Sequence, residues 1–172
     1  MWGDHRLSPY PVEAMETACI ALGANIPSPA GSPRQTLDAA LLRLAELGRI
    51  LASSYYYETA PVGYSNQPTF LNAAALLETG LAPQALLDHL LEIERGFGRD
   101  RSHGIPNGPR TLDLDLILYG GLVLNTPTLQ LPHPRMTERA FVLIPLAEIA
   151  PSRIHPLANK SMKQLLEDLI HK

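Results

Sequence analysis

The sequence predicts an α+β fold in which helices pack on one antiparallel sheet. Apolar and polar residues alternate over 112–119, as expected for a strand that buries one face. The segments 32–48 and 83–97 instead carry leucines at helical spacing. Short apolar runs before and after each helical segment supply the other strands, so strands and helices share one core.

The elements of the first half follow from local signals. Residues 1–15 carry prolines and no apolar period, and we expect an extension outside the fold, with the domain proper at 16–172. The apolar run 18–22 predicts a strand that is closed by a turn at 23–25. Ser32 can cap the first helix and form a capping box with Gln35, and Gly48 is expected to end that helix.

The later elements continue the same pattern. Strands are predicted at 50–58, 70–77 and 112–119, and helices from Pro83, over 137–149 and from Ser161. Gly120 and Gly121 predict a hairpin turn whose second strand is 122–124. The resulting order, β-α-β-β-α-β, is that of a ferredoxin-like split βαβ sandwich, with helices on one face and an additional C-terminal hairpin and helices.

Composition excludes several classes of protein. The 172 residues are 45% hydrophobic and 18% charged, which is typical of one folded domain. The net charge of −3 gives no general attraction to nucleic acid or to anionic membranes, and no apolar run approaches the length of a membrane span. The single cysteine, Cys19, lies in an apolar run and is expected to be a buried, inert thiol. We expect a cytoplasmic monomer.

Asp113 and Asp115 are the most informative residues for function. On a strand they point to the same side, and two neighbouring carboxylates that repel each other are typical ligands of Mg²⁺, which usually shares its coordination with substrate phosphates. Arginines at 99, 101 and 110 precede this strand, and His133 and Arg139 follow it. Acids for a metal and cations for phosphate together indicate phosphoryl transfer. Asn72, inside an apolar strand, could offer its amide to a heterocycle.

Five segments carry a resemblance to a known family. They are Ala21-Leu22-Gly23-Ala24-Asn25, Ser53-Ser54-Tyr55-Tyr56-Tyr57-Glu58-Thr59, Gln67-Pro68-Thr69-Phe70-Leu71-Asn72-Ala73, Gly108-Pro109-Arg110-Thr111-Leu112-Asp113-Leu114-Asp115, and Leu131-Pro132-His133-Pro134-Arg135-Met136 with Arg139-Ala140-Phe141. In this order they resemble the 6-hydroxymethyl-7,8-dihydropterin pyrophosphokinases of folate biosynthesis. The chain differs from many members at Pro106-Asn107, where an Arg-Trp pair is common.

The resemblance implies transfer of pyrophosphate from ATP to the hydroxymethyl group of the pterin, with release of AMP. It implies that Asp113 and Asp115 bind two Mg²⁺ ions and that Arg99 and Arg110 are catalytic. The positions implied to contact the pterin are Thr59, Ala60, Val62, Phe70, Asn72 and Phe141. Those implied to contact ATP are Glu94, Arg101, Leu116, His133 and Arg139.

Two other functions remain open from the residues alone. The chain could be a non-catalytic ferredoxin-like module that binds RNA, for which the cluster Tyr55-Tyr56-Tyr57 is the support and the net charge is the objection. It could also be a different Mg²⁺-dependent enzyme, such as a nucleotidyltransferase, because the paired acids are compatible with either reaction.

Overall fold

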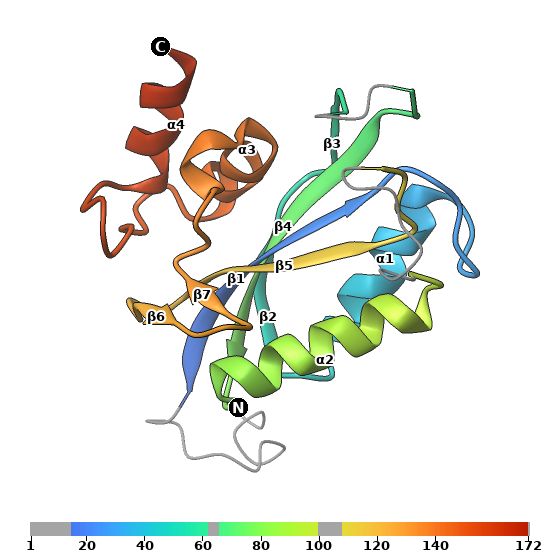
Figure 1. Cartoon of the computed structure of the whole chain (residues 1–172), viewed down its shortest axis with the longest axis horizontal. Coiled ribbons are helices and arrows are strands. Elements are labelled where there is room, and N and C mark those ends of the chain that lie inside the picture. Colours follow the sequence, from blue (N-terminus) through green and yellow to red (C-terminus); the bar gives the residue numbers. More distant parts are fainter. Residues whose placement is uncertain (1–14, 62–65, 100–107, 172) are drawn as a thin grey trace.

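A computed structural model describes residues 15–61, 66–99 and 108–171. Its centre is an antiparallel sheet with strand order β2-β4-β1-β5 (Figure 1). The central strands are β1 (Glu16–Ala24) and β4 (Phe70–Thr79), and the edges are β2 (Arg49–Ser53) and β5 (Asp113–Tyr119). The short β3 (Tyr57–Thr59) also pairs with β4, further along the same edge as β2. The predicted ferredoxin-like split βαβ fold is confirmed.

Helices cover both faces of the sheet. The two crossover helices, α1 (Pro33–Leu44) and α2 (Pro83–Gly96), lie on one face, as predicted. The C-terminal helices α3 (Ala140–Ile149) and α4 (Met162–Ile170) lie on the other face, so the molecule has three layers (Figure 1). Successive residues of a strand point to opposite faces, and accordingly Ile20 packs in the α1/α2 core while Cys19 packs in the α3/α4 core.

Both predicted capping boxes are confirmed. The Ser32 hydroxyl accepts a hydrogen bond from the Gln35 backbone N–H, and the Gln35 side chain accepts one from the Ser32 N–H. Ser161 and Gln164 make the same pair of bonds at the start of α4. These signals lie within four consecutive residues, and each satisfies two backbone N–H groups that a helix start leaves without partners.

The strand predicted at 50–58 is two strands instead of one. Ser54 separates them: its hydroxyl accepts the Ala74 N–H at 2.9 Å, so a side chain replaces the next bond of the ladder. The following N–H, that of Tyr55, donates to Glu148 of α3. The first strand, in contrast, continues through Gly23 and Ala24, which were predicted to turn.

The predicted hairpin between 112–119 and 122–124 is wrong. The N–H of Gly120, at a φ of 52°, donates to the Thr17 carbonyl at 2.8 Å, and β5 pairs with β1 instead. A separate two-stranded hairpin joins β6 (Leu124–Asn125) to β7 (Gln130–Leu131).

The helix predicted at 137–149 is interrupted at Arg139. A 3₁₀ turn, η3 (Met136–Glu138), precedes it, and Arg139 has extended backbone angles (φ −117°, ψ 100°) before α3 begins. This break lets the chain change direction beside the sheet. Cys19 is buried as predicted, and burial raises the pKa of its thiol to about 11. Within the described ranges no helix combines the length and the apolar character that crossing a bilayer requires.

Candidate active site

The site lies on the face of the sheet that carries α3, where that helix leaves part of the face uncovered. Directly opposed residues of antiparallel strands point to the same side. Gly23 of β1 lies opposite Asn72 of β4 and opposite Asp113 of β5. Two residues earlier, Ala21 lies opposite Asp115. The central strand therefore supplies a floor of small residues between an acidic edge and an amide.

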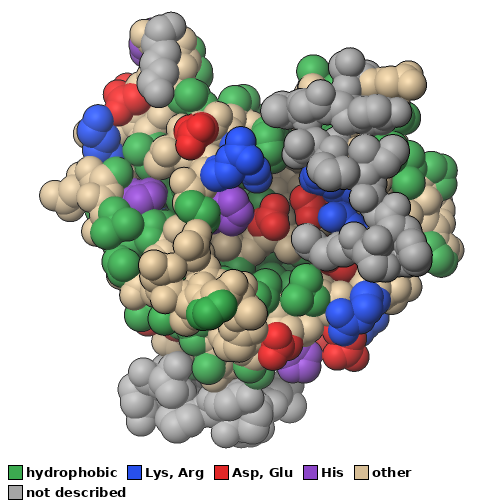
Figure 2. Space-filling view, viewed as in Figure 1, with side chains coloured by type: hydrophobic (Ala, Val, Ile, Leu, Met, Phe, Trp, Pro, Cys, Tyr) green, Lys and Arg blue, Asp and Glu red, His purple; other side chains and the backbone are tan. Residues whose placement is uncertain are grey.

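These residues line a cavity of about 810 Å³. Figure 2 shows acidic, basic and histidine side chains meeting in the hollowed centre of this face. Four arginines and three carboxylates line the described part of the cavity: Arg99, Arg110, Arg135 and Arg139, with Asp113, Asp115 and Glu138. The arginines therefore outnumber the carboxylates in the cavity, whereas the whole chain has a net charge of −3. This local excess of positive charge suits a polyanionic ligand.

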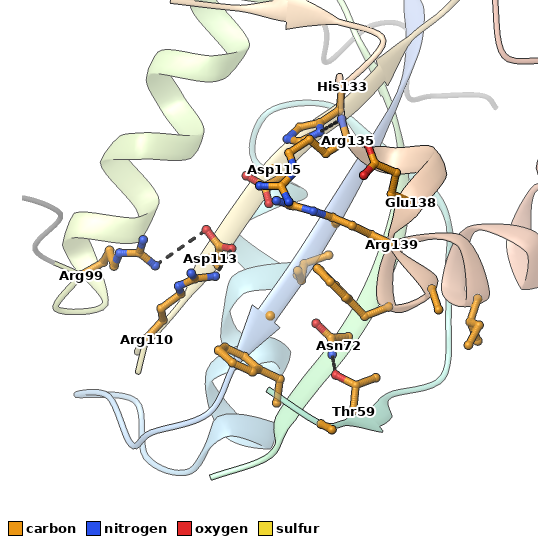
Figure 3. A pocket seen from close by; sticks show the side chains of 18 residues that line it. Thr59, Asn72, Arg99, Arg110, Asp113, Asp115, His133, Arg135, Glu138 and Arg139 are labelled. Carbon is orange, nitrogen blue, oxygen red and sulfur yellow. Dashed lines mark hydrogen bonds and ion pairs between the residues drawn. The ribbon is translucent and has the colours of Figure 1, made fainter. Parts of the chain in front are cut away.

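One half of the cavity is lined mainly by charged side chains, and Asp113 lies at its centre. Arg110 Nη1 donates to its Oδ2 at 3.1 Å, and Arg99 Nη1 lies 3.7 Å from its Oδ1 (Figure 3). The Arg99 guanidinium also donates to the Leu112 carbonyl at 3.3 Å. Asp113 and both arginines are partly buried, with side-chain exposures of 15–24%, so these charges are screened less than surface pairs would be.

His133, Arg135 and Arg139 form the adjoining wall beside Asp115 (Figure 3). His133 Nδ1 accepts the Arg135 backbone N–H at 3.2 Å, so in the neutral ring Nε2 carries the proton. Burial, assisted by the nearby Arg139 and Arg135 and opposed by Asp113, lowers the pKa of His133. At neutral pH the ring therefore offers an N–H donor without an added charge.

Two carboxylates suit a magnesium ion that also binds phosphate. Within the described ranges no group of three or more His, Cys, Asp or Glu side chains is arranged to hold a metal. Mg²⁺, however, is commonly held by one or two carboxylates together with substrate phosphates and water. Asp113 and Asp115 share one face and line the same cavity, so the donor set fits this ion.

The other half of the cavity is less charged. Asn72, only 6% exposed, donates from Nδ2 to the Thr59 hydroxyl, which fixes the orientation of the amide. Phe70 and Phe141 line the same cavity, with Arg110 5.5 Å from the centre of the Phe70 ring and Arg139 5.5 Å from that of Phe141. Aromatic walls with one oriented amide are typical of a site for a flat heterocycle.

The structure brings most of the predicted site residues together. Those that line the cavity are Thr59, Ala60, Phe70, Asn72, Arg99, Arg110, Asp113, Asp115, His133, Arg139 and Phe141. Val62 and Arg101 lie outside the described residues, as does Pro106-Asn107.

Glu94 and Leu116 were predicted to contact ATP and do not line the cavity. Glu94 is 1% exposed, and its Oε2 accepts the Leu114 N–H at 2.7 Å. Because β5 is an edge strand, this carboxylate caps an N–H that has no neighbouring strand. The Leu116 side chain packs in the α1/α2 core. Both residues therefore support the strand that carries the aspartates.

Sequence reasoning missed several residues that form the cavity. Ala21 and Gly23 are its floor, and Arg135 and Glu138 are part of its rim. The alternation of small residues along the first strand was a signal for the floor. Arg135 stood in one of the segments that carry the resemblance but had no role assigned to it, and Glu138 stood in none of them. The 3₁₀ turn that follows Arg135 brings both to the site.

Comparisons with known proteins agree with this geometry. The family model described as 7,8-dihydro-6-hydroxymethylpterin-pyrophosphokinase matches residues 19–151. A Pseudomonas aeruginosa 2-amino-4-hydroxy-6-hydroxymethyldihydropteridine pyrophosphokinase is 47% identical over 132 residues, which cover 77% of this chain and 79% of that protein. The Haemophilus influenzae protein of the same name is 41% identical over 144 residues, covering 83% and 86%.

Longer proteins contain a similar region. The chain is 40% identical over 137 residues to the folic acid synthesis protein FOL1 of Dictyostelium discoideum; the match covers 80% of this chain but 20% of that protein. A Plasmodium falciparum HPPK-DHPS crystal structure superposes with a TM-score of 0.72 at 17% identity, covering 91% of this chain and 46% of the other, and supports the fold. With the family model spanning most of the chain, the protein belongs to the 7,8-dihydro-6-hydroxymethylpterin pyrophosphokinase family, as the sequence resemblance predicted.

Proposed function

We propose that this protein transfers the terminal pyrophosphate of ATP to the hydroxymethyl oxygen of 6-hydroxymethyl-7,8-dihydropterin, for tetrahydrofolate biosynthesis. A bond forms between that oxygen and the β-phosphorus, the bond from this phosphorus to the α-phosphate oxygen breaks, and AMP leaves. The hydroxyl proton is released to solvent. The observation that carries the proposal is the row Asn72–Gly23–Asp113, which lies along one cavity with an oriented amide at one end and a carboxylate contacted by two arginines at the other.

The charged half would bind the triphosphate. Arg99 and Arg110 would act as catalytic residues that neutralise charge on the transferred group, because phosphoryl transfer depends mainly on positioning and electrostatic stabilisation. His133 and Arg139 would contact ATP from the adjoining wall beside Asp115. Asp113 and Asp115 would hold Mg²⁺, with two ions expected; when bound, the metal would neutralise phosphate charge and align the chain.

The amide half would bind the pterin. Asn72 gives one N–H to Thr59, which leaves its carbonyl oxygen and second N–H to hydrogen-bond the edge of a ring. Phe70 and Phe141 would enclose the two faces of the ring, with Thr59 and Ala60 at its border. Holding the two substrates next to each other would favour attack by the pterin alcohol over attack by water.

The two alternative functions lose support. Two members of the tyrosine cluster have other partners, since the Tyr56 hydroxyl donates to Asp38 and the Tyr57 hydroxyl to Glu148. The guanidinium of Arg34 also lies 5.0 Å from the centre of the Tyr56 ring and covers one face of it, so the cluster gives little support to RNA binding. The family comparisons favour a pyrophosphokinase over a nucleotidyltransferase.

The domain boundaries, the oligomeric state and the location of the protein are further parts of the proposal. We divide the chain into an extension, 1–15, and a pyrophosphokinase domain, 16–172, since β1 begins at Glu16 and α4 ends at Ile170. We propose a cytoplasmic monomer without nucleic-acid or membrane partners. Light scattering after size exclusion should return a mass near 18.8 kDa, and twice that mass would contradict the monomer.

The reaction is tested by identifying the released nucleotide. We expect AMP from ATP only when the hydroxymethyl-dihydropterin and Mg²⁺ are both present, and none after chelation. Asp115→Asn should abolish this activity without unfolding the protein. Asp168→Asn is the matched control and should retain activity. It removes an exposed carboxylate of α4 that pairs with Lys160. Release of free pyrophosphate, or AMP formation without the pterin, would contradict the proposal.

A further inference from the structure

Asn25 is a buried polar residue just outside the cavity, and it hydrogen-bonds to both sides of it. Its side chain is at the end of β1, 3% exposed, and it is not among the residues that line the cavity. The amide nitrogen Nδ2 donates to Gln67 Oε1 at 2.8 Å and to the Pro68 carbonyl at 3.0 Å. The amide oxygen Oδ1 accepts the Arg110 backbone N–H at 2.8 Å.

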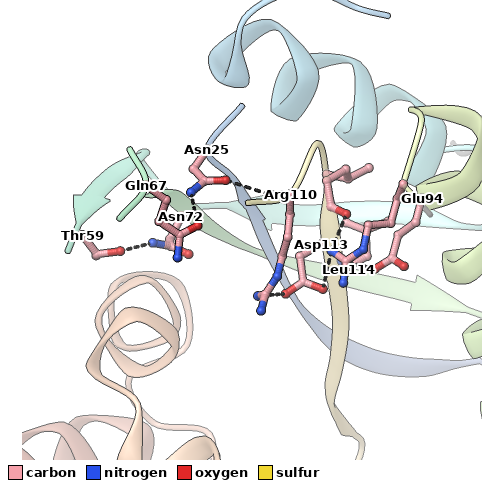
Figure 4. A network of polar contacts seen from close by, with 10 residues as sticks. Asn25, Thr59, Gln67, Asn72, Glu94, Arg110, Asp113 and Leu114 are labelled. Atoms are coloured by element: carbon pink, nitrogen blue, oxygen red, sulfur yellow. Dashed lines mark hydrogen bonds and ion pairs between the residues drawn. The ribbon is translucent and has the colours of Figure 1, made fainter. Parts of the chain in front are cut away.

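The main chain of Asn25 strengthens one of these connections. Its N–H donates to the Arg110 carbonyl at 3.1 Å, so both backbone groups of Arg110 are bound to one residue. The Arg110 side chain extends over the cavity and donates to Asp113 (Figure 4). Its guanidinium also lies 5.5 Å from the centre of the Phe70 ring. Asn25 thus fixes the backbone from which the Arg110 side chain extends.

The other connection reaches the heterocycle half. Gln67 and Pro68 lie in the segment that leads into β4, and the first residues of that strand include Phe70 and Asn72. Figure 4 shows Asn25 between this segment and Arg110. A single buried carboxamide therefore satisfies partners from two chain segments that meet different halves of the cavity. Leaving such buried partners unsatisfied is costly, so the geometry of both segments depends on this amide.

We propose that Asn25 is a positioning residue for the pyrophosphoryl transfer. The oxygen and the nitrogen of its side-chain amide have different roles, which substitutions can separate. The oxygen fixes the backbone of Arg110 and thereby the rate of the chemical step. The nitrogen fixes the segment before β4 and thereby the affinity for the pterin. This inference rests on the proposed function, because it assigns the two halves of the cavity to those substrates.

The chemistry of asparagine allows the two duties to be separated. Asn25→Asp keeps an oxygen that accepts the Arg110 N–H, but it cannot donate to Gln67 or to the Pro68 carbonyl. We expect KM for the pterin to rise roughly tenfold while kcat stays within about threefold of wild type. Asn25→Ala removes both atoms, and we expect the same rise in KM together with a fall in kcat of roughly tenfold or more.

A control and a second variant guard against loss of folding. Thr79 is 0% exposed at the far end of β4, and its hydroxyl also joins two backbone groups, the Leu47 carbonyl and the Leu81 N–H. Thr79→Val should change neither kinetic constant by more than about twofold, since its bonds lie away from the cavity. Gln67→Leu removes one acceptor of the Asn25 amide and should raise KM for the pterin without lowering kcat.

Amide hydrogen exchange tests the connection without any assay of activity. The Arg110 N–H should exchange roughly fivefold faster or more in Asn25→Ala, and at close to the wild-type rate in Asn25→Asp. Wild-type protein that forms no AMP would refute the proposed function, while the exchange rates would still test this connection. Equal kcat values in Asn25→Asp and Asn25→Ala, kinetics within twofold of wild type in Asn25→Ala, or the same losses in Thr79→Val would overturn the inference.

Discussion

Gly23 of β1 lies directly opposite both Asp113 of β5 and Asn72 of β4, so β1 places no side chain between this carboxylate and this amide. Because glycine has no side chain, the space above β1 at this point stays open to the cavity. A Cβ built on Gly23 would lie 3.1 Å from Asn72 Oδ1, closer than ordinary van der Waals contact. The glycine is therefore required by space above the sheet, since its own backbone is that of an ordinary strand.

Gly23→Ala should lower activity without lowering stability. The new methyl group would displace the Asn72 amide by a few tenths of an ångström, and we expect KM for the pterin to rise on the order of tenfold. Alanine in a strand is favoured over glycine by roughly 0.5–1 kcal/mol, so the melting temperature should not fall. Gly121→Ala, where a Cβ meets nothing within 4 Å, is the control and should keep wild-type kinetics. An unchanged KM in Gly23→Ala would contradict the assignment of Asn72 to the pterin.

Arg110→Ala should reduce kcat by on the order of 10² or more, the usual effect of removing a donor that stabilises transition-state charge. Arg110→Lys keeps the charge but loses the planar fork that reaches Asp113 and the contact with the Phe70 ring, so we expect it to recover only part of the rate. Single-turnover kinetics measure the chemical step directly. Full activity in Arg110→Ala would remove this residue from the catalytic set.

Local signals predicted the parts of the fold that short segments determine. The capping boxes at Ser32 and Ser161 and the alternation around Asp113 and Asp115 depend on neighbours a few residues away, and the structure confirms them. The break at Ser54 could not be predicted in the same way. It depends on a bond from the Ala74 N–H and on a carboxylate of α3, both distant in sequence.

The same distinction between local and distant signals applies to the residues of the site. Arg110, Asp113, Asp115 and Asn72 were predicted from their types and spacing, and the structure gathers these four residues around one cavity. The predicted hairpin after Gly121 was wrong because Leu124 pairs with Leu131 of β7 and does not return along β5, and sequence spacing alone favoured the nearer strand. The Glu94 carboxylate caps an N–H on the outer edge of β5, a relation that depends on strand order and not on spacing along the sequence. Its assignment to ATP stays a prediction.

Glu148 connects the wall formed by β3 to the wall formed by α3. Its Oε1 accepts the Tyr57 hydroxyl and the Tyr55 N–H, and this carboxylate raises the pKa of Tyr57 to about 12. We expect Glu148→Ala to cost about 1 kcal/mol or less in unfolding free energy, because the contact is exposed. The two walls carry Thr59 and Phe141, so KM for the pterin should rise severalfold with little change in kcat.

Glu148→Gln is the matched control for that change. The amide oxygen can still accept one of the two hydrogen bonds, so its KM should lie between those of wild type and Glu148→Ala. Denaturant unfolding and steady-state kinetics on the same preparations separate stability from substrate binding. A fall in kcat at constant KM would mean that the contact acts on the phosphate half instead.

Acid should destabilise the protein through two histidines. Burial lowers the pKa of His155, whose Nδ1 accepts the Leu157 and Ala158 N–H groups at 3.1 and 2.9 Å, and it lowers the pKa of His133. In the unfolded chain both rings take up protons near their ordinary pKa of about 6.5. As the pH falls below that value the unfolded state therefore binds more protons than the folded state, and the unfolding free energy declines.

Replacing His155 should flatten this dependence. In His155→Asn an amide oxygen can take the place of Nδ1 as acceptor, but the side chain no longer titrates. Urea unfolding from pH 8 to pH 5 should show a smaller loss of stability for the variant than for wild type. The difference should be absent above about pH 7.5, where both histidines are neutral in either state. A variant that loses stability with acid as steeply as wild type would mean that His155 keeps its ordinary pKa in the folded protein.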